Sequence, residues 1–342
     1  MHQGLTSAGI WQDTGELPDS LAATIDEARG FDDVVRLLSR PGTRRLVASG
    51  NGASYYVAQA LWLAALEGGR YPIEVVAVPA GLLARGAFRW RDGDVFVAVS
   101  SSGEMRDVIE ALESPSFPRP FALVTATPDS TLGRTADACA LVSVPNQRAV
   151  THTQAFCGAV LACLAIWARF TDDGALAAIV QSAPELCGSA IADTTAWAED
   201  AFTGVATPTA AIAFGTGPGW AAALESALLV KEVARIPCEG VETREGATAA
   251  MTGLLPEHLA LSLPSLDDKL IDEAEQICRR LGAAVLRAPG GTSADRRLSG
   301  ILTFPAAVAI STELALRGGW SPDNPAWIDA YYLTARKQDR TG

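Results

Sequence analysis

Residues 44–67, RRLVASGNGASYYVAQALWLAALE, match residues 208–232, PTAAIAFGTGPGWAAALESALLVKE. Each passage reads as a short apolar strand, a G-x-G turn and a long helix, with the GNG at 50–52 in register with the GTG at 215–217. A repeat of this size indicates a duplicated domain rather than a solenoid of small units.

Apolar, β-branched runs alternate with helical patterns in both halves of the chain. The runs lie at residues 73–78, 95–99, 121–125 and 140–144, and at 259–263, 283–286 and 301–304. Buried runs that alternate with helices are typical of a parallel sheet covered on both faces. We therefore expect an α/β fold of two tandem doubly wound, Rossmann-like domains, each with a roughly five-stranded parallel sheet flanked by helices.

The length of 342 residues also favours two domains. We expect an N-terminal helical arm at 1–30, a first domain at 31–172, a connecting helix at 173–198, and a second domain with a C-terminal tail at 199–342.

Composition excludes several classes of partner. The net charge of −12 makes nucleic acid an improbable partner. No apolar run looks as long as the roughly 20 residues of a membrane span, and the N-terminus lacks signal-peptide features, so a cytoplasmic location is expected. The six cysteines and three histidines have no paired spacing, so neither a metal site nor another cofactor is expected.

Ligands of open parallel sheets bind beyond the carboxyl ends of the strands, here the loops at 49–54, 100–104 and 215–220. The most informative loop is Ser100-Ser101-Ser102-Gly103-Glu104, between a buried strand and a helix. Three hydroxyls and free backbone N–H groups at a helix start form an anion cradle. The alternative interpretation is a plain helix N-cap.

The segment SSSGEM at 100–105 resembles S-x-S-G-E-T, the phosphate-binding signature of the double sugar-isomerase (SIS) domain family. That family includes the isomerase domain of glucosamine-6-phosphate synthase and stand-alone phosphosugar isomerases and deaminases. Four further segments resemble family motifs in the same order, over nearly the whole chain: GNGASYY at 50–56, VTHTQAF at 150–156, ALESALLVKEVARIPCEGVETREGA at 223–247, and SPDNPAW at 321–327.

The resemblance implies a site for a sugar or sugar phosphate. The ligand-binding residues that it implies are Gly52, Ala53, Ser54, Ser100, Ser101, Ser102, Glu104, Val150 and Glu225.

The resemblance also implies Glu232 as the general base, with Glu245 and His152 assisting ring opening or proton transfer. A base of this kind needs a pKa raised by burial. The apolar run at 227–230 makes the helix of Glu232 largely apolar, which favours a carboxylate that faces a site. The alternatives are a solvated surface charge for Glu232, a helix cap for Glu245 and a structural histidine for His152.

Three positions depart from the family pattern. Met105 replaces a phosphate-contacting Thr, and Arg106 could compensate only by turning back into the loop. Glu245 stands where relatives have His. Ala330 falls near the place of a Schiff-base Lys, and Lys337 lies too far along the chain to replace it, which argues against amide-nitrogen transfer.

We therefore expect an isomerase or deaminase that transfers a proton between C1 and C2 of an open-chain sugar or aminosugar phosphate, as a homodimer and without glutaminase activity. The alternative is a non-catalytic sugar-phosphate sensor. A nicotinamide enzyme is disfavoured because Tyr55 and Trp220 occupy the place of the third glycine of a dinucleotide-binding turn.

Overall fold

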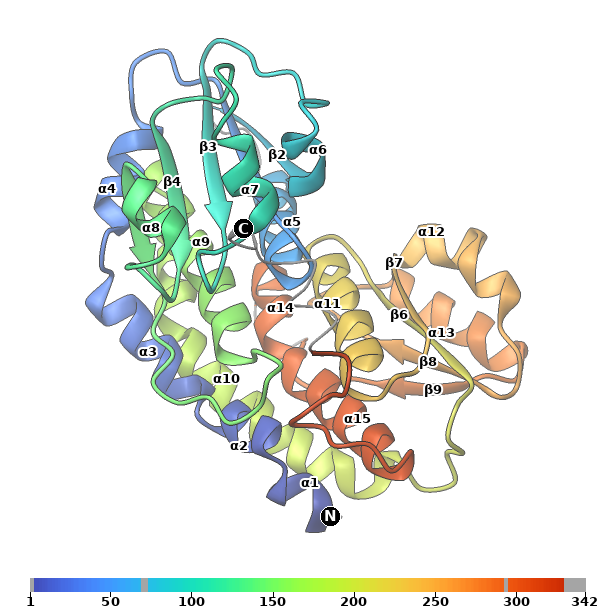
Figure 1. Cartoon of the computed structure of the whole chain (residues 1–342). Coiled ribbons are helices and arrows are strands. Elements are labelled where there is room, and N and C mark those ends of the chain that lie inside the picture. The colour runs from blue at the N-terminus through green and yellow to red at the C-terminus, as the bar shows by residue number, and fades with distance from the viewer. Residues whose placement is uncertain (1–2, 69–72, 292–294, 329–342) are drawn as a thin grey trace, which may run out of the picture. The chain divides into compact units, whose positions relative to one another are not determined.

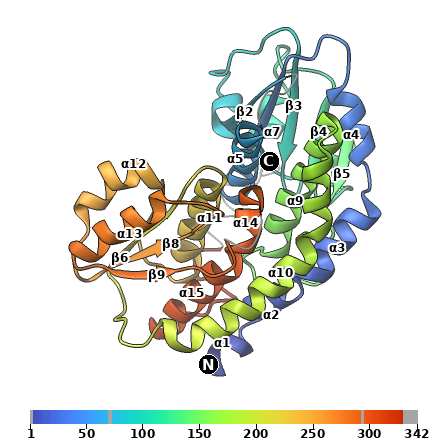
Figure 2. The same cartoon turned by 180° about the vertical axis from the view of Figure 1, so that it is seen from behind.

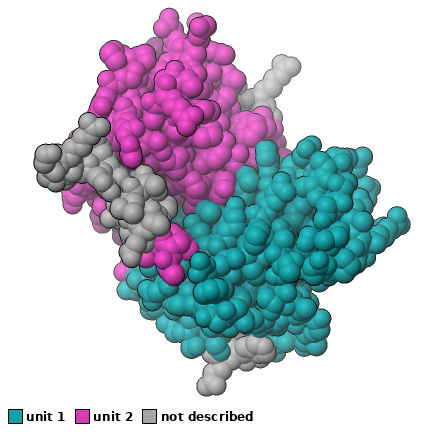
Figure 3. All heavy atoms as spheres, turned by 45° about the vertical axis from the view of Figure 1, so that its right-hand side comes forward, with its two compact units in different colours: residues 1–19, 146–157, 182–325 teal, residues 20–145, 158–181, 326–342 magenta. Residues whose placement is uncertain are grey.

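The computed structural model describes residues 3–68, 73–291 and 295–328 (Figure 1). The chain divides into two compact units, which Figure 3 shows in teal and magenta. Unit 1 comprises residues 1–19, 146–157 and 182–325, and unit 2 comprises residues 20–145, 158–181 and 326–342.

Unit 2 contains a parallel sheet of five strands in the order β2-β1-β3-β4-β5. The strands are β1 (Arg45–Gly50), β2 (Glu74–Pro79), β3 (Asp94–Val99), β4 (Phe121–Thr125) and β5 (Ala138–Leu141). Every residue of β1 and of β4 is buried, as expected for a sheet covered on both faces. The predicted run at 140–144 begins two residues too late.

Helices flank this sheet (Figures 1 and 2). They are α3 (Leu17–Glu27), α4 (Phe31–Leu38), α5 (Ala53–Glu67), α6 (Ala80–Ala84), α7 (Arg106–Ala111) and α8 (Thr131–Thr135). The pattern of α4 explains its place: Phe31, Val34, Leu37 and Leu38 share one buried face, which packs on β5. Acidic residues in its first turn and Arg36 in its last turn complement the helix dipole.

Unit 1 contains a second parallel sheet, in the order β7-β6-β8-β9. Its strands are β6 (Ala210–Gly215), β7 (Cys238–Glu242), β8 (His258–Ser262) and β9 (Ala284–Arg287). The described residues give this sheet four strands rather than about five. The expected strand at 301–304 is wrong, because Ser299–Leu302 forms the helix α14. A short, wholly buried apolar run lacks the periodicity that separates strand from helix.

The remaining helices of the described residues lie mainly in unit 1, except that most of α9 and the start of α10 belong to unit 2. They are α1 (Gln3–Ser7), α2 (Gly9–Gly15), α9 (Gln154–Thr171), α10 (Gly174–Ala201), α11 (Pro218–Val233), α12 (Thr243–Thr248), α13 (Leu270–Arg280) and α15 (Phe304–Arg317), with short 3₁₀ turns at Ala250–Gly253 and Arg296–Leu298. Helices α11, α1 and α2 all pack against α15, whose first twelve residues are buried.

Among the residues that the structure describes, three helical stretches are long and apolar enough to cross a membrane, by length and composition: α9, α10 and residues 296–317. The expectation that no run reaches this length was therefore wrong. In the apolar windows of these stretches, 83% of α9 and all of 296–317 is buried within the fold. A helix that is apolar all round is also typical of a protein core, which accounts for these two stretches.

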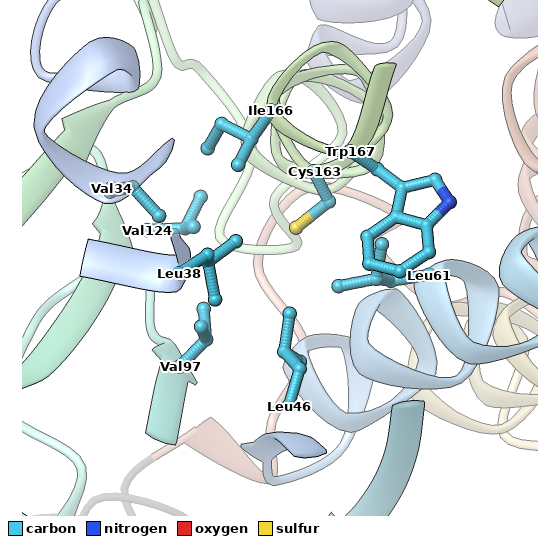
Figure 4. A pocket seen from close by; sticks show the side chains of 9 residues that line it. All are labelled: Val34, Leu38, Leu46, Leu61, Val97, Val124, Cys163, Ile166 and Trp167. Carbon is cyan, nitrogen blue, oxygen red and sulfur yellow. The ribbon is translucent and has the colours of Figure 1, made fainter. Parts of the chain in front are cut away.

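The core of unit 2 encloses a small apolar cavity of about 10 Å³ (Figure 4). It is lined by Val34, Leu38, Leu46, Leu61, Val97, Val124, Cys163, Ile166 and Trp167. This volume holds about one water molecule, and a lining of apolar side chains offers that water too few partners. The cavity is a packing defect of the core and does not bind a sugar.

Candidate functional site

The glycine turn after β1 begins the polar edge of the first sheet. Gly50 ends the strand, and a Cβ there would lie 2.4 Å from the carbonyl carbon of Ser54. Only glycine therefore allows α5 to start this close to β1. Gly52 is exposed, and Ala53 and Ser54 are half-buried, so the turn presents them at the carboxyl end of the strand, where sequence analysis placed a ligand.

The loop after β3 is shaped by its own serines. The buried Ser100 hydroxyl accepts the N–H of Gly103 at 3.1 Å, and the Ser102 hydroxyl accepts the N–H of Glu104 at 3.3 Å. Gly103 has φ 62°, and a Cβ there would lie 1.8 Å from Oγ of Ser130. The tight turn leaves Ser101 and Ser102 half-buried.

The end of β4 fixes the carbonyl group of Ser101. The hydroxyls of Thr125 and Thr127 each donate to that oxygen at 3.0 Å, and the N–H of Ala126 donates at 3.2 Å. Sequence analysis missed these threonines. The T-A-T that directly follows the buried run FALV was the available signal, because strand ends of a parallel sheet meet at one edge.

The neighbours of the serine loop make mostly structural contacts. The Glu104 carboxylate accepts the N–H of Thr131 at 2.7 Å and so caps α8. Met105 packs in the apolar core of unit 2, and Arg106 pairs with Glu110 at 2.7 Å instead of turning back into the loop. Free backbone N–H groups were expected in this loop to bind an anion, but those of Gly103 and Glu104 donate to serine hydroxyls. The polar groups that the loop can offer to a ligand are therefore largely its hydroxyls.

One contact joins the glycine turn of unit 2 to the helix that follows the serine loop. The Asn51 side-chain amide donates to the Asp107 carboxylate in the first turn of α7. The glycine turn at 50–54 is therefore linked to the start of α7, directly after the serine loop.

Helix α11 in unit 1 carries the two carboxylates singled out from the sequence. Glu225 is 2% exposed, and its Oε2 atom has no hydrogen-bond partner within the described residues. Burial raises the pKa of Glu225 well above its ordinary value, and the charge of Glu232 raises it further. Glu232 is half-buried. Burial raises its pKa to about 7, against the opposing effect of Lys231.

The segment before α9 also belongs to unit 1. Val150 is half-buried, and its N–H donates to the carbonyl oxygen of Asp323 at 2.9 Å. His152 is exposed between Thr151 and Thr153, two buried residues. Cys157, one turn into α9, lies close enough to Glu225 for that carboxylate to help raise the pKa of the thiol. The structure thus brings this segment near α11.

Glu245, unlike Glu225, is exposed to solvent. It lies in the first turn of α12, where its N–H donates to the carboxylate of Glu242, the N-cap residue, at 3.0 Å. Its catalytic role stays a prediction. Ala330 and Lys337 lie outside the described residues.

Comparisons with known proteins show what the sequence and the fold are similar to. Residues 42–171 match the family model of the SIS domain. The chain is 28% identical over 300 residues to glutamine–fructose-6-phosphate aminotransferase (isomerizing) from Caulobacter vibrioides, an alignment that covers 79% of this chain and 47% of that protein. The chain thus spans less than half the length of the curated relatives it matches.

Solved structures share the fold over most of the chain. The C-terminal domain of glucosamine-fructose-6-phosphate aminotransferase from Francisella tularensis has a TM-score of 0.77 at 18% identity, covering 93% of this chain and 98% of that one. Glucosamine-6-phosphate deaminase from Thermotoga maritima has a TM-score of 0.72 at 19% identity, with the same coverage. The protein therefore has the α/β fold of these structures, with two parallel sheets. Within the chain, residues 42–171 are similar to an SIS domain.

Proposed function

We propose that the chain is a sugar-phosphate or aminosugar-phosphate isomerase or deaminase that transfers a proton between C1 and C2. The relatives by sequence and by fold are named for aminotransfer to fructose 6-phosphate and for deamination of glucosamine 6-phosphate, which supports this class of substrate. No metal or organic cofactor is required of the enediol route, which needs positioned acids and bases. A homodimeric state and a cytoplasmic location stay predictions.

The observation that carries the proposal is the half-buried position of Glu232 on α11, a helix whose other side chains are mostly buried, where burial raises the pKa of Glu232 to about 7. A general base works best when its pKa lies near the operating pH, because it must both take up and return the proton. Glu225, seven positions earlier on the same helix, is buried, and its pKa is raised by that burial and by the charge of Glu232. It is therefore suited to remain protonated beside the base.

Binding of the substrate is assigned to the polar loops of unit 2. Ser54, Ser101 and Ser102 are each half-buried and lie on loops at the carboxyl end of the sheet. Hydroxyl groups both donate and accept hydrogen bonds, so these side chains suit either a phosphate group or sugar hydroxyls. Gly52 and Ala53 allow the backbone to approach the ligand closely.

A two-step experiment tests the proposal. A thermal-shift screen of hexose, pentose and aminosugar phosphates, each against its unphosphorylated form, first identifies ligands, since a ligand stabilises the native state it binds. Each hit is then incubated with the protein in D₂O. We expect solvent deuterium to appear at C2. Binding without exchange would favour the sensor, and the absence of any stabilising sugar would overturn both functions.

A further inference from the structure

Residues 146–153 carry Val150 and His152, yet they form neither helix nor strand. Their backbone N–H groups therefore need partners from elsewhere, because buried N–H groups left unpaired are costly. Two aspartates from distant parts of the chain supply these partners, Asp13 on α2 and Asp323 near the end of the described residues.

Asp13 holds the first part of this segment. It is 1% exposed, and its Oδ2 atom accepts the N–H of Arg148 at 2.8 Å and that of Ala149 at 2.9 Å. The Arg148 guanidinium adds an ion pair at 2.8 Å. The side-chain amide of Gln154 donates to the Asp13 carbonyl oxygen at 3.1 Å, so α2 contacts the segment on both sides of Val150.

Asp323 holds the next residue and α2 together. Its carbonyl oxygen accepts the Val150 N–H at 2.9 Å. Its carboxylate accepts the N–H groups of Gly9 at 2.9 Å and Ile10 at 2.8 Å, the start of α2. The consecutive N–H groups of residues 148–150 are thus all bonded to these two aspartates.

Gly9 lets the three pieces meet. A Cβ at this position would lie 3.0 Å from the Cβ of Arg148 and 3.1 Å from the Cγ of Asp323. Helix α2, the segment and the Asp323 turn therefore pack directly against one another within unit 1, with no space for a side chain at residue 9.

We propose that Asp13 and Asp323 are positioning residues that fix the backbone of residues 148–150, and with it the place of Val150, for the substrate. This inference rests on the proposed function, which assigns Val150 and His152 to the site. A segment without its own secondary structure would lose conformational freedom when the ligand binds, and fixing it beforehand removes that entropic cost. The hydroxyls of Thr151 and Thr153, buried without a hydrogen-bond partner in the described structure, come directly after this anchored backbone.

The test compares Asp13→Asn and Asp323→Asn with Asp19→Asn, a change at an exposed aspartate in the first turn of α3. An asparagine keeps one acceptor oxygen but turns an NH₂ group toward backbone donors. Because Asp13 and Asp323 lie on different elements, one variant remains informative if the other does not fold. The readouts are amide hydrogen exchange of residues 146–153 and the KM and kcat of the sugar substrate.

We expect faster exchange of residues 146–153 in both variants, and a KM raised about 10- to 100-fold with a smaller change in kcat. Asp19→Asn should match the wild type in both readouts. Unchanged amide exchange in both variants would overturn the holding role, and faster exchange with an unchanged KM would overturn the positioning role. A wild type that turns over no sugar would instead overturn the proposed function, and with it the link to a substrate, while the amide exchange would still report on the two aspartates.

Discussion

The glycine turn after β1 and the glycine turn after β6 have nearly the same backbone. Gly52 has φ 54° and ψ −131°, and Gly217 has φ 55° and ψ −127°. The strand orders β2-β1-β3-β4 and β7-β6-β8-β9 correspond as well. These likenesses support a duplicated domain, which stays a proposal because the family match ends at residue 171.

The two regions differ in the residues that follow. In unit 2, β3 leads into a serine–glycine loop. In unit 1, the equivalent strand β8 leads into Leu263, Pro264 and Ser265, all buried. The polar groups of unit 1 follow its glycine turn instead: the turn after β6 leads into α11, which carries Glu225 and Glu232. The comparison teaches that two units with the same strand order and the same glycine turn can differ in the polar groups they carry: hydroxyls after β3 in unit 2 and carboxylates on α11 in unit 1.

The largest effect on stability is expected at Gly103, in the serine–glycine loop that follows β3 in unit 2. Gly103→Ala places a Cβ 1.8 Å from Oγ of Ser130 at φ 62°, and should lower the unfolding free energy by about 2–5 kcal/mol, from strain plus overpacking. Gly86→Ala is the matched control, because Gly86 also has φ 62° but nothing within 4 Å of a Cβ. Equal losses at the two positions in urea unfolding would contradict the tight packing of the serine loop.

The equivalence of the two turns is tested by Gly50→Ala and Gly215→Ala. A Cβ would lie 2.4 Å from backbone atoms of Ser54 in one case and of Gly219 in the other. We expect both variants to lose about 1–3 kcal/mol of unfolding free energy. Gly50→Ala should mainly weaken sugar binding, and Gly215→Ala should mainly lower turnover. Clearly unequal losses in denaturant titrations would show that the turns are not equivalent.

The buried carboxylate of α11 should make stability depend on pH. The pKa of Glu225 is raised above 4.5 in the folded state, so the native protein holds this proton longer than the unfolded chain. The stability that the protonated Glu225 contributes is fully present below pH 4.5. It is lost as the pH rises through the pKa of Glu225 in the folded state. Glu225→Gln removes the titrating group and therefore this pH-dependent loss. The unfolding free energy of the variant minus that of the wild type should then rise with pH, by up to about 1.4 kcal/mol per pH unit.

The smallest effect concerns the charge beside Glu232. Lys231 lowers the pKa of that carboxylate, so Lys231→Gln should shift the rising limb of the pH–rate profile for exchange from near pH 7 to higher pH. Lys269→Gln, at an exposed position in the same unit, serves as the control. A limb that does not move in Lys231→Gln would argue that another group sets it.

Local patterns were enough to predict much of the fold. The two G-x-G turns and the strands at 95–99 and 121–125 follow directly from apolar runs bounded by turn residues, and β3 and β4 lie there within one residue. The run at 301–304 failed because burial on all sides erases periodicity. Strand β7 was missed because Cys238–Glu242 contains two glutamates and a glycine and reads as a turn.

Sequence patterns were a better guide to the burial of candidate site residues than to the contacts that those residues make. The alanines and leucines around Glu225 indicated burial, and Glu225 is buried. The exposure of Glu245 and the pairing of Arg106 with Glu110 depend on side-chain direction, which sequence spacing alone does not define. The bonds of Asp13 and Asp323 join residues 135 to 314 positions apart, a separation at which no local pattern reports a contact.

The most direct test of the account is the Glu232→Gln variant with the best sugar ligand from the screen. We expect its Kd to match that of the wild type while deuterium incorporation at C2 falls at least about 100-fold. Glu257→Gln, at an exposed glutamate outside the proposed site, should leave both unchanged. Wild-type exchange rates in Glu232→Gln would contradict the assignment of the base, and with it the proposed chemistry of α11.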